Sequence, residues 1–275
     1  MQIKLIALDI DGTLLNSNLE VTAATIDALN RARERGIHIV LSTGRLVVEC
    51  EDILEKLPCI RYVNSCTGAE VVDLQTGKTV AGRRIEGDEI LRLYELLKDL
   101  DLMPCAFDPV DGMAHCSVEK FRLCMENCSP DVARHLRRFY CPEEDFEAYL
   151  RSKDSLIKYY MPCFNERAIT DVAQRMKEEP YTVVQCGPSD MEIIPVGTDK
   201  GLGLQLLAQA LGLEREQVMA IGDSENDIGM LRYAGLPVVM GNGLPHVKEL
   251  ARYITDDNDH DGVAKAVNMV LEGEL

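Results

Sequence analysis

Short apolar runs alternate with amphipathic segments in the first third of the chain. Residues 3–8 form an apolar run that ends at acidic residues, which is typical of a buried strand followed by a loop. Residues 21–35 carry apolar positions between charged ones and stop at Gly36, which predicts a helix. The same alternation predicts strands at 37–41 and 60–64, a helix at 46–57, and a hairpin with strands at 70–73 and 78–81.

The last third repeats this alternation. Strand, helix, strand is the pattern of a parallel sheet covered by helices on both faces, so we expect an α/β fold with a Rossmann-like parallel sheet core. The predicted helices cover residues 202–211, 228–234 and 263–271, and the predicted strands cover 218–221 and 237–240.

The middle of the chain follows a different pattern, which predicts an α+β insertion. It starts with an amphipathic helix around residues 90–97. We therefore expect one domain from residues 1–82 and 189–275, and a second, inserted cap domain from 83–188. Within the insertion, strands are predicted near 103–107, 113–118, 156–161 and 181–186, and a helix at 166–177.

Composition and charge exclude several classes of function. The 275 residues are 46% hydrophobic and 27% charged, as in an ordinary globular protein. The chain has 29 Lys and Arg residues against 46 Asp and Glu, a net charge of −17, which should repel nucleic acid and anionic membranes. No apolar run is long enough to span a bilayer and the N-terminus lacks a secretory signal, so the expected location is the cytoplasm.

Ten cysteines raise the question of disulfides or zinc. No Cys-x-x-Cys pair occurs, whereas structural zinc sites usually have such tight spacing. We therefore expect reduced thiols in a cytosolic protein. The residues considered as metal ligands are His115, Cys116, Cys124, Cys128, His135 and Cys141.

Polar residues follow the predicted strands or open a predicted helix at four places. The carboxyl ends of parallel strands lie at one edge of a sheet, so these segments are expected to converge on one crevice. The first segment has two carboxylates two residues apart, just after a strand, which indicates a metal or acid/base site. The segments are Asp9-Ile10-Asp11-Gly12-Thr13, Ser42-Thr43-Gly44-Arg45, Lys200-Gly201 and Gly222-Asp223-Ser224-Glu225-Asn226-Asp227.

The other three segments supply groups that suit a phosphate and a cation. Hydroxyls and backbone N–H groups at a helix start can hold phosphate oxygens, although a Ser-Thr-Gly turn alone is more often a helix cap. Lys200 would provide local positive charge in an otherwise acidic protein. Asp223 and Asp227 could bracket a cation.

In order and placement these segments resemble the haloacid dehalogenase (HAD) superfamily, and within it the Cof-type (class IIB) phosphatases. The resemblance covers almost the whole chain, and the insertion lies where that family has its large cap. The matching motifs are Leu8–Leu14, Ser42–Arg45, Asp199–Gly201 and Gly222–Asp227, with weaker matches at Met191–Ile193, Val239–Asn242 and Asp261–Ala264.

The resemblance implies a phosphoric monoester hydrolase that acts on a small phosphorylated metabolite, such as a sugar phosphate or a phosphorylated cofactor intermediate. Asp9 would be the nucleophile and would form an aspartyl-phosphate. Asp11 would be the general acid and base. Mg²⁺ would be held by Asp9, the Asp11 backbone carbonyl and Asp223, with Asp227 holding metal-bound water or Lys200.

The resemblance also implies which residues bind the substrate. Thr43, the Gly44 N–H, Lys200 and Asn226 would bind the phosphate oxygens. Arg45 and Thr67 are candidate substrate contacts, and Thr67 stands where the family commonly has Asn. The family also commonly has Asn-Ala where this chain has Asn242-Gly243. We expect no nucleic-acid or membrane partner, and a monomer or small homo-oligomer.

Three other functions fit parts of the pattern. A phosphomutase could use the same machinery and would give an isomerised sugar phosphate without free phosphate. A phospho-acceptor signalling module combines similar residues but has no place for the insertion. A non-catalytic phosphate-binding protein could keep the fold, although the intact acidic residues and Lys200 argue against it.

Overall fold

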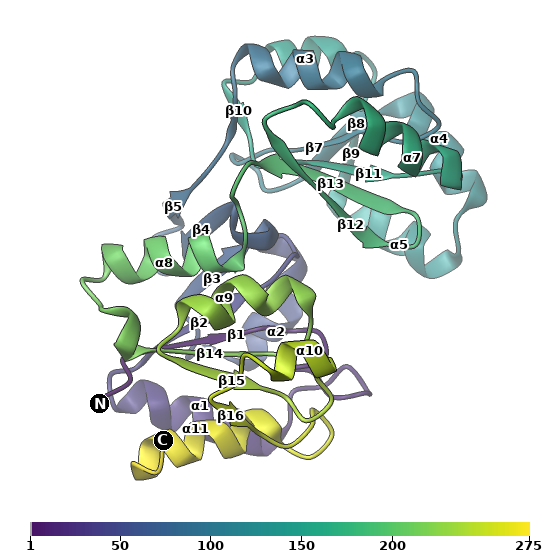
Figure 1. The fold of residues 1–275 in the computed structure, drawn as a ribbon. Coiled ribbons are helices and arrows are strands. Elements are labelled where there is room, and N and C mark those ends of the chain that lie inside the picture. The colour runs from purple at the N-terminus through teal and green to yellow at the C-terminus, as the bar shows by residue number, and fades with distance from the viewer. Residues whose placement is uncertain (1) are drawn as a thin grey trace. The chain divides into compact units, whose positions relative to one another are not determined.

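Figure 1 shows the fold in a computed structural model that describes residues 2–275. The chain divides into two compact units. The core unit contains the residues up to 82 together with 198–275, and the inserted unit contains residues 83–197. The prediction placed the second boundary at 188 instead. The inserted unit extends further because residues 190–195 form a strand that pairs with two other strands of this unit.

The core unit is built on an eight-stranded sheet. Six of its strands are parallel, and the last two turn back as an antiparallel hairpin. In spatial order the strands are β16 (Tyr253–Ile254), β15 (Leu236–Val239), β14 (Val218–Gly222), β1 (Leu5–Leu8), β2 (His38–Ser42), β3 (Tyr62–Ser65), β4 (Glu70–Asp73) and β5 (Lys78–Gly82).

Helices cover both faces of this sheet, as the predicted parallel sheet requires (Figure 1). On β1, Ile6 and Leu8 pack with α1 and α11, whereas Leu5 and Ala7 pack with α8 and α9. The helices of this unit are α1 (Ala23–Glu34), α2 (Glu51–Lys56), α8 (Lys200–Ala210), α9 (Ile228–Tyr233), α10 (Pro245–Lys248) and α11 (Gly262–Glu272).

The inserted unit has a six-stranded, mainly antiparallel sheet, with α3, α6 and α7 packed on one face through a separate apolar core. In spatial order its strands are β12 (Tyr181–Gly187), β13 (Asp190–Pro195), β11 (Tyr159–Pro162), β7 (Cys105–Phe107), β8 (Ala114–Ser117) and β9 (Tyr140–Glu143), and a small pair joins β10 (Ser155–Leu156) to β6 (Ile85–Glu86). The helices are α3 (Asp88–Leu97), α4 (Val118–Asn127), α5 (Pro130–Phe139), α6 (Phe146–Arg151) and α7 (Glu166–Arg175).

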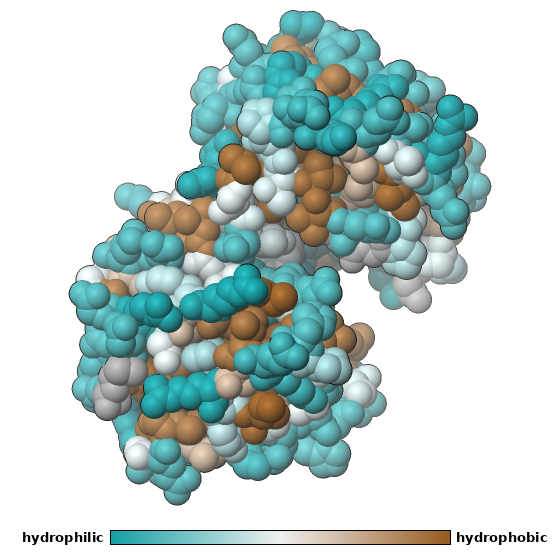
Figure 2. Space-filling view, viewed as in Figure 1, coloured by the Kyte–Doolittle hydropathy of each residue, from teal (hydrophilic) through white to brown (hydrophobic). Residues whose placement is uncertain are grey.

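The predicted α/β fold with an α+β insertion is confirmed, and the main differences lie in local structure. The segment predicted as a helix from residue 46 starts as a 3₁₀ turn at Val48–Cys50, and the Glu49 carboxylate of this turn accepts a hydrogen bond from the Leu46 N–H. In the insertion, the pattern did not predict β9, β13, α4, α5 or α6, whose apolar positions are interrupted by charged residues. Most of the surface drawn in Figure 2 is hydrophilic. None of the described helices is long and apolar enough to cross a bilayer.

Candidate active site

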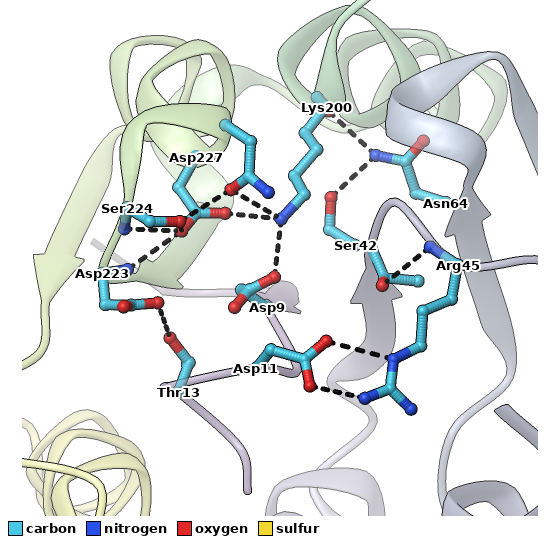
Figure 3. Close-up of polar contacts among 12 residues, drawn as sticks. Asp9, Asp11, Thr13, Ser42, Arg45, Asn64, Lys200, Asp223, Ser224 and Asp227 are labelled. Atoms are coloured by element: carbon cyan, nitrogen blue, oxygen red, sulfur yellow. Dashed lines mark hydrogen bonds and ion pairs between the residues drawn. The ribbon is translucent and has the colours of Figure 1, made fainter. Parts of the chain in front are cut away.

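The ends of three parallel strands bring the predicted polar segments together (Figure 3). Asp9 directly follows β1, and its N–H donates to the Ile221 carbonyl of β14 at 3.0 Å. Thr43 directly follows β2, and its N–H donates to the Asn64 carbonyl of β3 at 2.9 Å. These bonds continue the sheet one residue further and fix the direction in which each loop leaves it.

Lys200 lies at the centre of this edge and is fully buried. Its ammonium donates to Asp9 Oδ1 at 2.6 Å and to Asp227 Oδ1 at 2.7 Å. A third bond goes to Asn226 Oδ1 at 3.2 Å. Three segments that are far apart in the sequence therefore meet on one side chain.

The start of α8 determines where Lys200 lies. The Asp199 side chain caps the helix by accepting a hydrogen bond from the Leu202 N–H at 2.7 Å. The Asn64 side-chain amide donates to the Lys200 carbonyl and to Ser42 Oγ, both at 2.9 Å. Asn64 thus ties the ends of β2 and β3 to the first turn of α8.

The acidic loop after β14 is held by Asp227. Its Oδ2 accepts hydrogen bonds from the N–H groups of Asp223 at 2.9 Å and Ser224 at 3.0 Å. The Asp223 carboxylate points towards residues 9–13 after β1, the first acidic loop, where its Oδ1 accepts a hydrogen bond from Thr13 Oγ1 at 3.1 Å. Asp227 is therefore occupied by the protein on both oxygens.

Carboxylate oxygens of Asp9, Asp223 and Asp227 lie within 4.8 Å of one another. The hydrogen bonds of the described residues use Oδ1 of Asp9 and Oδ1 of Asp223, which leaves Oδ2 of each for a further ligand. Three carboxylates face the single ammonium of Lys200, so two negative charges are left uncompensated. Hard oxygen donors with an excess of negative charge suit a small divalent cation such as Mg²⁺.

Burial and charge shift the ionisation of this cluster. Burial raises the pKa of Asp9 to about 7 against the lowering effect of the Lys200 ammonium, and the carboxylates of Asp227 and Asp223 add to the rise. Burial, followed by the charge of Asp227, also raises the pKa of Asp223. For Lys200, burial lowers the pKa, but the carboxylates of Asp9 and Asp227 outweigh it and the pKa is raised.

A glycine allows the two acidic loops to approach each other. Gly12 has a φ of +81°, and a Cβ at this position would lie 2.6 Å from Asp223 Oδ2. Any other residue would be strained and would also collide with the carboxylate. Only glycine therefore fits at position 12, because the Asp223 carboxylate occupies the space that a side chain would need.

Asp11 lies at the exposed rim of the site and is paired with Arg45. The Arg45 guanidinium forms two hydrogen bonds to the Asp11 carboxylate, from Nε at 3.0 Å and from Nη2 at 2.5 Å. This paired geometry holds both planar groups in one orientation. The sequence placed both residues at the site but did not predict that they pair.

The loop after β2 packs against the loop after β3. The Thr43 carbonyl accepts a hydrogen bond from the Thr67 N–H at 3.0 Å, and Thr43 Oγ1 accepts one from the Arg45 N–H at 3.1 Å. Thr67 Oγ1 faces Gly44, at 3.5 Å from the position of a Cβ on that glycine. Thr67 has a φ of +56°, which is rare for a β-branched residue.

The structure thus groups the sequence-predicted residues into two sets at one edge. Asp9, Asp223, Asn226 and Asp227 gather around Lys200, and Asp11, Thr43, Gly44, Arg45 and Thr67 lie on the loops after β1, β2 and β3 beside them. Their predicted roles, including the Asp11 carbonyl as a ligand, stay predictions. Thr13 belongs to the first predicted segment but was given no role there, and Asn64 was not predicted as part of the site. A polar residue at the end of an otherwise apolar strand was the available signal for Asn64.

Among the described residues, a second acidic group that could hold an ion lies in the inserted unit and consists of Asp108, Asp111 and His115. The Asp108 carboxylate is already bound by Lys153 and by the Tyr149 hydroxyl, which makes it a poor ligand. Neither of the two groups found in this part of the chain includes a cysteine.

Comparison with known proteins agrees with this geometry. Residues 6–267 match the sequence profile of haloacid dehalogenase-like hydrolases. The chain is 29% identical to the Bacillus subtilis 5-amino-6-(5-phospho-D-ribitylamino)uracil phosphatase YcsE, covering 97% of this chain and 95% of that protein. It is also 29% identical to the B. subtilis phosphatase YwpJ, covering 98% and 100%.

A solved structure supports the same assignment. The crystal structure of a haloacid dehalogenase-like hydrolase from Bacteroides thetaiotaomicron superimposes with a TM-score of 0.82 at 28% identity, covering 98% of this chain and 100% of that one. Fold, sequence profile and relatives agree over almost the full length. The chain therefore belongs to the haloacid dehalogenase-like hydrolases, in their Cof-type branch, and is a phosphatase that acts on phosphoric monoesters of small molecules.

Proposed function

We propose that the chain hydrolyses a sugar phosphate or a phosphorylated cofactor intermediate by way of an aspartyl-phosphate on Asp9. The observation that carries this proposal is the placement of Asp9, a buried carboxylate bonded to Lys200 and facing a second acidic loop. YcsE, by its name, acts on a phosphate carried by a ribityl chain, which is a substrate of this class.

The proposal includes Mg²⁺ held by Asp9, Asp223 and the Asp11 backbone carbonyl. The donor set supports it, because both side chains keep one carboxylate oxygen for a ligand and the cluster has excess negative charge. Asp227 would stay outside the inner ligands, since Lys200 and two N–H groups occupy its oxygens. Mg²⁺ bound there would shield the charge of Asp9 from that of the phosphate.

In the proposed reaction, the Asp9 carboxylate oxygen that does not hold Mg²⁺ attacks phosphorus, and the bond from phosphorus to the leaving alkoxide breaks. Asp11 gives its proton to the leaving oxygen, and later takes a proton from the water that hydrolyses the aspartyl-phosphate. Water and the phosphoric monoester thus become alcohol and inorganic phosphate, and both carboxyl groups return to their initial state.

Lys200 and the loop after β2 would bind the transferring phosphoryl group. The ammonium of Lys200, the amide of Asn226, the Thr43 hydroxyl and the Gly44 N–H are the donors assigned to its equatorial oxygens. Charge on these oxygens is what phosphoryl-transfer enzymes mainly stabilise. Lys200 bonds to Asp9 Oδ1, so its charge lies beside the attacking group.

Arg45 has a separate part in this proposal. It holds the Asp11 carboxylate at the rim of the site through two hydrogen bonds. An incoming substrate would compete for the guanidinium, which would release Asp11 for proton transfer. Thr67 lies beside Gly44 and is proposed to contact the substrate. The inserted unit is proposed to set substrate specificity.

A phosphate-release screen tests the proposal. Hexose and pentose phosphates, glycerol phosphate and 5-amino-6-(5-phospho-D-ribitylamino)uracil would be assayed with Mg²⁺ and with EDTA. We expect turnover only with Mg²⁺, and a loss of at least about 10⁴-fold in Asp9→Asn, which keeps the shape of the side chain but removes the nucleophile. Equal turnover by both proteins would refute the mechanism, and isomerised sugar phosphate without free phosphate would indicate a mutase.

A further inference from the structure

The turn after β15 contacts both acidic loops of the active site. Asn242 Nδ2 donates to the Gly12 carbonyl at 2.8 Å, and the Leu244 N–H donates to the Asp223 carbonyl at 2.9 Å. The two loops also contact each other, because Thr13 Oγ1 donates to Asp223 Oδ1 at 3.1 Å. Three hydrogen bonds therefore join three loops into a closed ring.

The first link of this ring holds a flexible point of the backbone. Gly12 has a φ of +81° and no side chain of its own to fix it, so its peptide has more freedom than any other in the loop. It also borders the Asp223 Oδ2 atom, 2.6 Å from where a Cβ on Gly12 would lie. Holding the Gly12 carbonyl thus fixes the space beside the carboxylate oxygen that is left for a cation.

The orientation of the Asn242 amide follows from its two partners. Nδ2 faces a carbonyl, which can only accept, and Oδ1 accepts a hydrogen bond from the Asn258 N–H at 3.2 Å. If the amide were reversed, Oδ1 would face the Gly12 carbonyl and Nδ2 would face the Asn258 N–H, so neither hydrogen bond could form. Asn242 is exposed, so its amide is not needed to satisfy a buried core.

We infer that Asn242 is a positioning residue that preorganises the cation site, by closing the ring that orients Thr13 and the Asp223 carboxylate. A preorganised ligand loses less freedom when the cation binds, so opening the ring should weaken the affinity for Mg²⁺. This inference rests on the magnesium site of the proposed function. It assigns Asn242 no contact with the cation or with the substrate.

The test is the dissociation constant of Mg²⁺, measured by calorimetry on metal-free protein. Asn242→Ala and Thr13→Val each remove one link of the ring. Each is expected to raise the dissociation constant by about tenfold, with an unchanged melting temperature of metal-free Asn242→Ala. The double variant is expected to bind no more weakly than either single variant, because a ring that is already open cannot be opened again.

Ser17→Ala is the matched control. The Ser17 hydroxyl donates to Asp259 Oδ2 at 2.6 Å, so this variant removes another exposed hydrogen bond, between the segment that follows Thr13 and the segment that follows β16, without removing a link of the ring. Its dissociation constant should equal that of the wild type.

Wild-type affinity in Asn242→Ala, or effects that multiply in the double variant, would overturn the inference alone. A wild-type protein that binds no Mg²⁺ would overturn the proposed metal site and this inference with it. The exposed position of Asn242 makes its variant informative even where the buried Thr13→Val does not fold.

Discussion

Each unit of the protein contains a buried lysine paired with carboxylate, and the two surroundings differ. Lys200 in the core unit bonds to Asp9 and Asp227, within a group that also contains Asp223. Lys158 in the inserted unit bonds to Glu192, and its ammonium lies 4.7 Å from the centroid of the Phe107 ring. The first group carries excess negative charge, whereas the second pair is neutral in total.

The difference indicates what each lysine does. A buried ion pair that is neutral and packed beside aromatic rings, like Lys158 and Glu192, needs no further ion. Three carboxylates around one ammonium are stable only if protons or a cation offset the remaining charge, and this is where the pKa of Asp9 rises to about 7. Excess charge, more than burial, therefore distinguishes a binding site from a structural pair.

Backbone strain shows the same asymmetry. Among the described residues, the non-glycine residues with positive φ all belong to the core unit, and they are Leu19, Cys66, Thr67 and Asp261. Cys66 and Thr67 lie in the loop that supports Thr43. Strain in a loop beside the candidate site is tolerated because the surrounding structure holds it. The core unit thus combines unbalanced charge and strained backbone at the same sheet edge.

Replacing Lys200 should give the largest effect. Lys200→Met keeps much of the side-chain volume but removes the ammonium from Asp9 and Asp227. We expect the rate of phosphate release at saturating substrate to fall by about 10³-fold, because the phosphoryl oxygens lose a charged donor. Steady-state kinetics with Mg²⁺ measures this. A loss below tenfold would mean that Lys200 is as structural as Lys158.

The matched change in the inserted unit should act on stability. Lys158→Met leaves the Glu192 carboxylate buried without its ammonium, which should destabilise the protein by about 3 kcal/mol. Adding Glu192→Leu removes the remaining charge and should restore most of that stability. Urea unfolding measures both, and Mg²⁺ affinity should be unchanged throughout. A double variant less stable than Lys158→Met would contradict the structural interpretation.

The sequence predicted the core unit well for a physical reason. Strands buried on both faces are short continuous apolar runs, and polar residues directly after them must lie at one sheet edge, so Asp9, Thr43 and Asp223 could be placed without coordinates. The resemblance to a known family added their proposed roles. Neither source predicted the pairing of Arg45 with Asp11, because side chains on different loops meet only in three dimensions.

The inserted unit was harder to predict because its elements obey weaker patterns. The strand at Asp190–Pro195 carries a charged residue, Glu192, in its middle, and this hides the apolar run. That charge is tolerated because Lys158, the residue just before the neighbouring strand β11, neutralises it, a contact that no local pattern reveals. The domain boundary was therefore placed nine residues too early, at 188 instead of 197.

The charge imbalance of the core unit predicts a pH-dependent effect of Mg²⁺. The pKa of Asp9 is about 7 in the folded protein against an ordinary 3.8, and that of Asp223 is also raised. The folded state then holds protons that the unfolded state releases, so the metal-free protein loses stability as pH rises from about 4 to 7. Mg²⁺ binds the ionised carboxylates, and should add about 2 kcal/mol near pH 8 but little near pH 5.

Melting temperatures in EDTA and in Mg²⁺ at the two pH values measure this effect. Asp9→Asn serves as the control, because it removes the carboxylate of this cluster whose pKa is raised to about 7 and should flatten the pH dependence in EDTA. Equal stabilisation by Mg²⁺ at both pH values would contradict the role given to the carboxylates.

The smallest expected effect concerns the strained loop. Thr67 has a φ of +56°, a conformation that Asn adopts more easily than a β-branched residue. Thr67→Asn should therefore raise the free energy of unfolding by about 0.5–1 kcal/mol. Thr182→Asn in β12 is the control, since a strand favours Thr over Asn and this variant should be slightly destabilised. Thermal unfolding measures both, and a fall in stability in both variants would show that the loop holds Thr67 without strain.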